Sequence, residues 1–429
     1  MKKQYFGFFC FLLLSSCSDK DAYKEIQDKV QKILGKFPLT QQKDEEIRFA
    51  EAILFFVETE QKLKKNELDA VELQKLQNLC SHIMSAQPLE KVQIALEQFE
   101  DWCVQTYVDP ERREKIASWS SFIRPNKLEF EKLVPVEQPN AALPELMFGD
   151  SHHLRHRHGF KLTDPRMTDK QALREVDYCI LCHSRQKDSC SKGFPEKTGG
   201  YKKNPLGIPL AGCPLDERIS EMHALRYEGE AIGALAMIML DNPMCPGTGH
   251  RICNDCMKGC IFQKQEPVNI PQTETNTLTD VLNLPFGFEI YSLMTRFNPL
   301  NRKRPFALPY NGKNILVVGL GPAGYTLSHY LANEGFGVIG IDGLKLEPLD
   351  PTLTGIGKKF PKPLENYSDL KKELDERILM GFGGVSEYGI TVRWDKNFLG
   401  VIYLSLLRRK NTQFYGGVRF GGTLNLDDA

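Results

Sequence analysis

Eight of the twelve cysteines in this 429-residue chain fall within 82 residues, and this clustering constrains the fold more than any other sequence feature. The other four are scattered through the first quarter of the chain. A disulfide scaffold is normally a short secreted chain that is rich in cysteine throughout. A cluster confined to one segment of a long chain is more typical of metal ligation. The eight are Cys179, Cys182, Cys190, Cys213, Cys245, Cys253, Cys256 and Cys260.

The rest of the composition is that of an ordinary globular protein. Hydrophobic residues make up 41% of the chain and charged residues 26%, which argues against a disordered or membrane-embedded protein. Lysine and arginine together number 55, as do aspartate and glutamate, so no nucleic-acid footprint is expected. The length allows two or three domains, each with its own core.

The cysteine spacing points to a metal centre without fixing its kind. Cys179 and Cys182 fall on one turn, and Cys253, Cys256 and Cys260 follow at similarly short spacings. Thiolates this close suit tetrahedral zinc or a cubane cluster, although zinc accounts better for four cysteines than for eight. A Cys-Pro pair at Cys213 precedes residues 215–240, where apolar residues recur at helical spacing. A helix there would return the chain, so that the late cysteines meet the early ones.

An ordered series of motifs resembles a known module. After the paired cysteines come Cys-Pro-Leu at 213–215, Arg-Tyr-Glu-Gly at 226–229, Asp-Asn-Pro at 241–243, the three late cysteines, and Glu-Pro-Val-Asn-Ile at 266–270. The series resembles the amino-terminal iron–sulfur domain of the glutamate synthase small (beta) subunit, which dihydropyrimidine dehydrogenase shares. The resemblance covers roughly residues 177–342. It implies a helical domain that holds two 4Fe–4S clusters.

The resemblance also implies a ligand set. The family's third and fourth cysteines lie three residues apart, whereas residues 191–212 form an insertion between the corresponding cysteines here. This departure leaves the role of Cys190 open, and Cys245 has no ligand role in the scheme. One cluster would take Cys179, Cys182, Cys190 and Cys260, and the other Cys213, Cys253, Cys256 and Glu274.

A glycine loop follows the cysteine-rich region. The Val- and Ile-rich residues 314–318 predict a strand, residues 325–334 a helix, and residues 337–341 a second strand that ends at Asp342. Glycines in this context let the backbone approach a pyrophosphate, and an acid at Asp342 can accept hydrogen bonds from a ribose. The Pro-Ala pair favours FAD over NAD; a Rossmann-like turn without ligand is the alternative. The loop itself is Gly319, Leu320, Gly321, Pro322, Ala323 and Gly324.

Beyond Asp342 the match becomes weaker. Residues 381–390 resemble the family's glycine-rich flavin-contacting segment, and residues 416–422 are consistent with another backbone-lined site. The family's second glycine loop, which binds NADPH, has no counterpart here. We therefore expect an amino-terminal portion of a larger or split flavoprotein whose FAD and NADPH domains are completed by a partner chain or a larger synthase-like subunit.

The amino-terminal part carries no catalytic signal. A basic start, an apolar stretch at residues 6–14 and Leu-Ser-Ser-Cys ending at Cys17 look like a lipoprotein leader. Export of an unfolded chain conflicts with cluster insertion in the cytoplasm, so we expect a cytoplasmic protein, with lipid attachment through Cys17 as the alternative. Residues 19–124 have a helical pattern in which Cys80 and Cys103 are expected to be buried. A connector follows, and we expect its His/Arg-rich run at 152–158 to be solvated or to face a partner rather than to bind metal.

These observations give four expected segments: a leader at 1–18, a helical region and connector at 19–165, an iron–sulfur domain at 166–298, and a truncated FAD/NAD(P)-binding domain at 310–429. The expected fold class is an α-helical amino-terminal region and an α-helical 4Fe–4S domain, followed by a partial α/β Rossmann-like FAD-binding domain. The expected function is that of an electron-transfer oxidoreductase, with no general acid or base to nominate. The alternatives are an inactive remnant or assembly subunit, and a structural zinc-binding module.

Overall fold

The computed structural model describes residues 127–134, 136–149, 154, 158–159, 161–185, 188–250, 252–357, 360–374, 376, 381–388 and 394–429, with a few isolated residues before them. The leader with Cys17, the helical pattern with Cys80 and Cys103, and most of the His/Arg-rich run lie outside these residues. No helix of the described part is long and apolar enough to cross a membrane.

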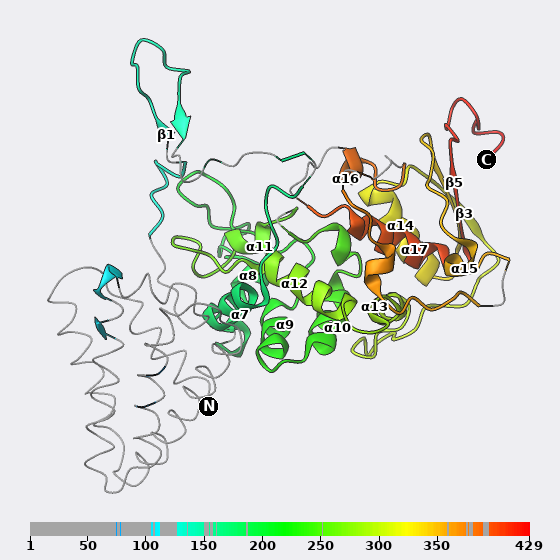
Figure 1. The fold of residues 1–429 in the computed structure, drawn as a ribbon, viewed down its shortest axis with the longest axis horizontal. Helices are drawn as coiled ribbons and strands as arrows, with labels where there is room; N and C mark the ends of the chain where they lie inside the picture. The colour runs from blue at the N-terminus through cyan, green and yellow to red at the C-terminus, as the bar shows by residue number, and fades with distance from the viewer. Residues whose placement is uncertain are drawn as a thin grey trace, which may run out of the picture. The chain divides into compact units, whose positions relative to one another are not determined.

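The chain forms two compact units whose boundaries differ from the expected segments. The first comprises residues 1–126 and 169–180, and the second comprises residues 127–168 and 181–429. In the first, α7 (Asp169–Tyr178) buries Ala172, Val176 and Tyr178 on its apolar side. The second holds the glycine loop and all the clustered cysteines except Cys179, so most of the region expected to bind clusters belongs to the same unit as the region expected to bind a nucleotide (Figure 1).

The second unit begins with a hairpin and a set of short helices. The strands β1 (Val136–Glu137) and β2 (Phe148–Gly149) pair antiparallel. Next come η2 (Cys182–Arg185) and α8 (Ser189–Lys192), and further on η3 (Cys245–Gly247) and α11 (Asp255–Lys258). Four of the eight clustered cysteines, Cys182, Cys190, Cys245 and Cys256, lie in these short elements.

Residues 215–240 form two helices rather than the single helix that their apolar spacing suggests. α9 (Ile219–Tyr227) and α10 (Ala231–Asp241) are separated by Glu228, Gly229 and Glu230. Gly229 has a φ of 85°, in the left-handed region that glycine adopts without strain, so the chain turns there. α10 packs against both α9 and α12 (Ile270–Leu282), and α13 (Gly287–Met294) packs against α12.

The helix α12 is polar in sequence but buried. Thr273, Thr275, Thr277 and Thr279 turn their hydroxyls to carbonyl oxygens of the preceding turn at 2.8 to 3.0 Å. Hydroxyls satisfied in this way can be buried at little cost. From α9, Arg226 donates to Asn276 at 2.7 Å and pairs with Asp280 at 2.6 Å, which joins the two helices.

The glycine-loop region is a three-stranded parallel sheet in the order β3-β4-β5. β3 (Asn314–Val318) leads through the loop into α14 (Pro322–Asn333) and on to β4 (Gly337–Asp342), close to the bounds that the sequence predicts. After α15 (Pro351–Thr354), η4 (Tyr367–Leu370) and α16 (Val385–Tyr388), the buried helix α17 (Asn397–Leu407) leads into β5 (Thr412–Gly416). Val317, Ala332 and Val338 form the core beneath the sheet.

A buried arginine connects the helical region to this sheet. Arg409 donates to Asn333 Oδ1 of α14 at 2.7 Å and to the carbonyl oxygen of Thr295, at the end of α13, at 3.2 Å. Burial, with Arg296 as a lesser cause, lowers the pKa of Arg409 to about 9. Nearby, Gly247 lies so close to Tyr325 of α14 that a Cβ there would come within 2.4 Å of the phenol oxygen. These contacts set the cysteine region against the glycine loop.

Candidate functional site

The insertion between Cys190 and Cys213 is a self-contained loop whose two ends meet. The Cys213 amide donates to the Cys190 carbonyl oxygen at 2.8 Å, and the Phe194 amide donates to Leu210 O at 2.9 Å. Two isolated bridges, Pro195 with Tyr201 and Lys203 with Pro209, continue the pairing outward. The insertion therefore lengthens the sequence between the two cysteines but leaves their backbones side by side, joined by a hydrogen bond.

Glycines allow the late cysteines to approach the two ends of the insertion, where Cys190 and Cys213 meet. A Cβ on Gly259, between Cys256 and Cys260, would lie 2.6 Å from Ser189 O and 2.8 Å from the Cα of Gly212. Only a residue without a side chain fits at this distance. The contact packs α11 against α8. The sequence contains this signal, since a glycine precedes Cys260, but nothing in the spacing shows which segment it faces.

Cys213, Cys253 and Cys256 share one electrostatic environment with Glu274. Burial raises the pKa of Cys256 well above its ordinary value, and Glu274, Glu217, Cys213 and Cys253 raise it further. Burial likewise raises the pKa of Cys213 to about 11, with Glu217 as the next cause. Buried thiols among acids resist ionisation, whereas a bound metal or cluster stabilises them as thiolates. The members of the second predicted ligand set therefore lie within electrostatic reach of Cys256, with Cys253 exposed to solvent, and their donor chemistry fits a metal centre.

The site contains a second buried acid that sequence reasoning missed. Glu217, just before α9, and Glu274 in α12 are both buried. Burial raises the pKa of Glu217 to about 7 and that of Glu274 well above its ordinary value, and the nearness of Glu217 raises the pKa of Glu274 further. Asn242 Nδ2 donates to Glu274 Oε1 at 3.0 Å and also hydrogen-bonds Glu217. The available signal was the position of Glu217 four residues after Cys213.

Cys245, which has no ligand role in the family scheme, lies beside the same acids. It is 2% exposed, and burial raises its pKa well above the ordinary thiol value, with Glu274 and then Glu217 as further causes. Its backbone belongs to η3, which packs against α17. The structure therefore places a fourth thiol near the two carboxylates, on the side that faces the glycine-loop region.

The first predicted ligand set is divided between the two units. Cys179 follows α7 in the first unit, where its amide donates to Glu175 O at 3.1 Å. Cys182, Cys190 and Cys260 belong to the second unit and are buried. Cys190 Sγ donates to Asp188 Oδ1 at 3.0 Å.

Among the described residues, one group of potential metal ligands has its ligand atoms within 4.8 Å of one another, and it contains no cysteine. It consists of His183, Asp188 and Glu221, a combination that the sequence did not suggest. His183 pairs with Glu221, but its side chain is 62% exposed. Tetrahedral zinc, with Zn–S bonds of about 2.3 Å, needs thiolates roughly 4 Å apart. Three sulfurs at zinc spacing are thus not preformed in the described part of the chain.

The glycine loop has the local geometry of a phosphate-binding turn. Gly319 has a φ of 89°, and a Cβ on Gly324 would lie 1.8 Å from Gly319 O, so both positions require glycine. Gly321 is the N-cap residue of α14 and has no side chain that could accept a hydrogen bond from the first amides of the helix. Pro322 occupies the first turn, where its missing N–H costs nothing. Amide groups of this helix end are therefore available to an anion.

Asp342 and residues 381–384 lie against the loop. The Asp342 carboxylate accepts hydrogen bonds from the amides of Leu320, at 3.1 Å, and Leu344, at 2.9 Å. The amide of Gly383 donates to Leu320 O at 2.8 Å, and a Cβ on Gly384 would come within 2.8 Å of the Cα of Gly321. The segment predicted to contact flavin thus packs on the second glycine of the loop, while Asp342 also fixes the loop's backbone.

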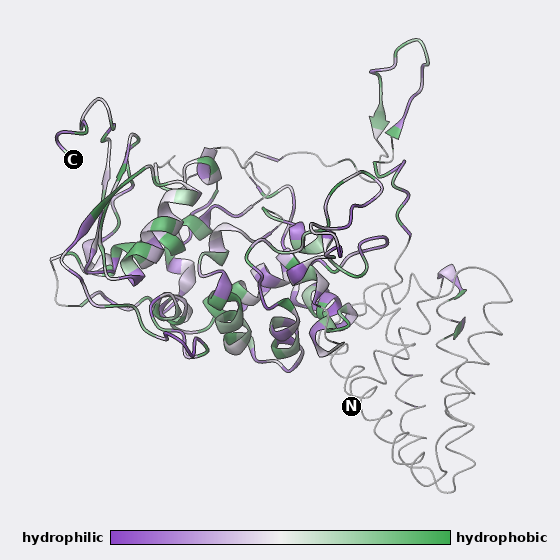
Figure 2. Cartoon of the chain, turned by 180° about the vertical axis from the view of Figure 1, so that it is seen from behind, coloured by the Kyte–Doolittle hydropathy of each residue, from purple (hydrophilic) through white to green (hydrophobic). Residues whose placement is uncertain are grey.

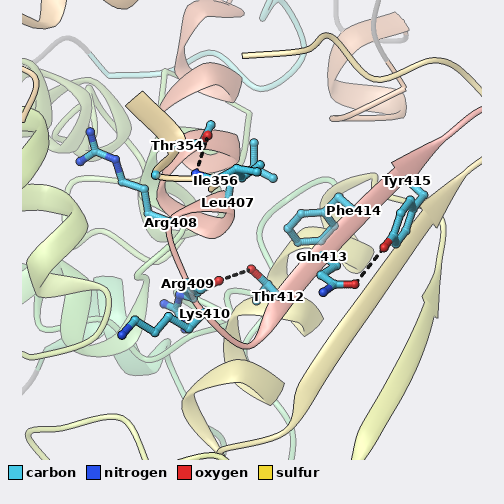
Figure 3. A pocket seen from close by; sticks show the side chains of 11 residues that line it. Thr354, Ile356, Leu407, Arg408, Arg409, Lys410, Thr412, Gln413, Phe414 and Tyr415 are labelled. Carbon is cyan, nitrogen blue, oxygen red and sulfur yellow. Dashed lines mark hydrogen bonds between the residues drawn. The ribbon is translucent and has the colours of Figure 1, made fainter. Parts of the chain in front are cut away.

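A pocket of about 420 Å³ lies elsewhere in the sheet region (Figure 3). Residues 407–410 at the end of α17, residues 412–415 of β5 and residues 354–356 line it. Arg408, which is one of the lining residues, donates hydrogen bonds to the Glu289 carboxylate at 2.5 Å and to the carbonyl oxygens of Leu353 and Lys362. None of the residues predicted to bind a cofactor lines this pocket.

No protein-family model matches the chain. It is 50% identical over 186 residues to the uncharacterized protein RP006 of Rickettsia prowazekii (strain Madrid E), a match that covers 43% of this chain and 25% of that protein. It is also 42% identical over 65 residues to the uncharacterized protein RP005 of the same organism, covering 14% and 22% respectively. The chain thus spans about a quarter of the length of the curated relatives it matches.

Proposed function

We propose that the chain is an electron-transfer component of a flavoprotein oxidoreductase resembling the glutamate synthase small subunit. It would carry two 4Fe–4S clusters next to an FAD site. The observation that supports the proposal is that Cys213, Cys253 and Glu274 all lie near enough to Cys256 to raise its pKa, within the unit that also holds the glycine loop. Three thiols and a carboxylate, mutually unfavourable as bare anions, are suitable ligands for a cationic iron centre.

In this proposal the residues have distinct roles. Cys213, Cys253, Cys256 and Glu274 would hold one cluster, with Asn242 orienting the Glu274 carboxylate. Cys179, Cys182, Cys190 and Cys260 would hold the other. The amide groups at the start of α14 would receive the flavin pyrophosphate. When bound, the clusters and flavin supply one- and two-electron redox chemistry, while the chain excludes water and sets the local charge.

The proposal also includes a partner chain that completes the sheet. β3 and β5 are the outer strands of the three-stranded sheet, and Val318 at the end of β3 is 54% exposed. Parallel sheets in nucleotide-binding folds normally extend beyond three strands and are covered on both faces. We therefore expect another chain, or a larger synthase-like subunit, to complete the FAD and NADPH domains. A cytoplasmic location follows in the same proposal, since clusters are inserted there.

The test is the cofactor content of anaerobically purified protein. We expect about eight irons and eight acid-labile sulfides per chain, with FAD near one equivalent. Clusters without FAD would favour a flavin domain that needs its partner. Zinc without sulfide would refute electron transfer and leave the structural zinc module. Protein without stoichiometric cofactor would support the inactive assembly subunit.

A further inference from the structure

The hairpin of residues 128–149, which we call the arm, is not covered by the other segments that the structure describes. Every described residue from 131 to 149 is exposed, and the backbone is anchored at its base by the Leu128 amide, which donates to Lys264 O at 3.0 Å. The strands of its described part are β1 and β2, of two residues each (Figure 1). A two-stranded ribbon in water is marginally stable by itself. Such an arm gains stability when another surface covers it.

The side chains of the arm are those of a contact surface. Hydrophobic residues occur along both of its strands (Figure 2). Glu137 pairs with Phe148 and Val136 with Gly149, so apolar side chains project on both faces of the ribbon. Contiguous exposed apolar residues mark interaction sites. The large ones are between 40% and 68% exposed: Leu133, Val134, Val136, Leu143, Leu146, Met147 and Phe148.

The charges of the arm and of the insertion are opposite. Residues 128–149 contain four glutamates and one lysine, whereas residues 191–212, which we call the lysine loop, contain four lysines and one glutamate. The lysine loop also exposes apolar side chains, namely Tyr201, Leu206 and Ile208. Its backbone is fixed by internal hydrogen bonds, including Lys202 N to Phe194 O at 2.9 Å and Leu210 N to Lys202 O at 2.8 Å. It is therefore a preformed basic and apolar surface.

We propose that the arm of one copy docks on the lysine loop of a second copy, and that two such contacts close a two-fold dimer. In a two-fold dimer each surface is used twice, so acidic arm meets basic loop on both sides. The exposed state of the arm within one chain shows that it does not cover its own loop. The formal net charge of the chain is zero, so a second copy meets no long-range repulsion.

The experiment is sedimentation velocity of the full chain with two charge-reversed variants. The arm variant carries Glu131→Lys, Glu137→Lys and Glu145→Lys, and the loop variant carries Lys197→Glu, Lys202→Glu and Lys203→Glu. Each variant alone places like charges at both contacts, so we expect its dimerisation to weaken at least tenfold. Mixing the two restores opposite charges at both contacts, and the mixture should dimerise about as tightly as the wild type.

Matched controls separate the contact from general surface charge. Glu373→Lys and Lys303→Glu change exposed charges outside both surfaces and should leave the dimer intact. A third variant, with Val134, Met147 and Phe148 changed to serine, should be monomeric with unchanged circular dichroism, because these side chains are exposed in the single chain.

Three results would overturn the proposal. One is a wild-type chain that stays monomeric at tens of micromolar. Another is a dimer that survives either charge reversal. The last is a mixture of folded variants that fails to form the mixed dimer, which would mean that the arm contacts a different surface. These readouts do not depend on iron or flavin content, so the proposal stands or falls separately from the proposed function.

Discussion

The cysteine region and the glycine loop are built in different ways within one compact unit. The glycine loop is contiguous: strand, turn, helix and second strand follow one another from residue 314 to residue 342. The site around Cys256 takes its groups from separate segments, namely Cys213, the turn at Cys253 and the buried helix α12. The comparison teaches that a local motif fixes its own geometry, whereas a site assembled from distant segments depends on the packing between them.

The sharpest way to test the assembled site is to remove one thiol. Cys256→Ser should lose about half of the bound iron, roughly four of eight atoms, because a cubane that misses one of its ligands is unstable. Iron and sulfide analysis measures the loss. Cys245→Ser is the matched control, since Cys245 is also buried beside Glu274 but has no ligand role in the proposal. Equal iron loss in both variants would show that Cys245 is a ligand too.

The contiguous motif can be tested with two glycines. Gly324→Ala places a methyl group 1.8 Å from Gly319 O and should cost about 3 kcal/mol of stability together with FAD binding. Gly321→Ala meets its nearest atom at 3.6 Å, so the fold should stay intact while FAD affinity falls. Thermal unfolding and FAD titration separate the two effects. Comparable unfolding temperatures for both variants would contradict the conclusion that the turn requires glycine at position 324 because of its close approach to Gly319 O.

The paired acids predict a pH dependence of the metal-free protein. The pKa of Glu217 rises from 4.5 to about 7, so folded chain keeps a proton that unfolded chain releases. Stability should therefore fall as pH rises through this window, by roughly 1–3 kcal/mol. Glu217→Gln should flatten the profile, as measured by urea unfolding between pH 4.5 and 8. An unchanged slope would mean that Glu217 is not protonated in the folded chain.

The smallest effect is expected at Asp342. Its carboxylate accepts two backbone amides, one from the glycine loop and one from Leu344. Asp342→Asn keeps one acceptor oxygen, so it should lose about 1 kcal/mol of stability and only a modest part of FAD affinity. Unfolding by urea and FAD titration measure both quantities. A loss of FAD binding as large as that of Gly324→Ala would show that Asp342 acts mainly on the ligand.

Several features could be read from the sequence, and others could not. The strand before the glycine loop and the strand that ends at Asp342 have nearly the predicted bounds, because alternating and apolar patterns report burial directly. The apolar spacing of residues 215–240 suggested one helix, but the turn at Gly229 divides it. The position of Glu217 four residues after Cys213 was a weak signal, since a lone glutamate is usually exposed.

The sequence by itself determined which chemistry is available: eight clustered cysteines, a glycine turn after an apolar strand, and a polar helix that carries Glu274. It also determined the turn itself, because positive φ at Gly319 and the tight approach of Gly324 are properties of adjacent residues. Only the tertiary structure brought Glu217 beside Glu274 and closed the insertion so that Cys190 meets Cys213. These contacts join segments far apart in the chain, and their energy comes from packing and desolvation that no local pattern encodes.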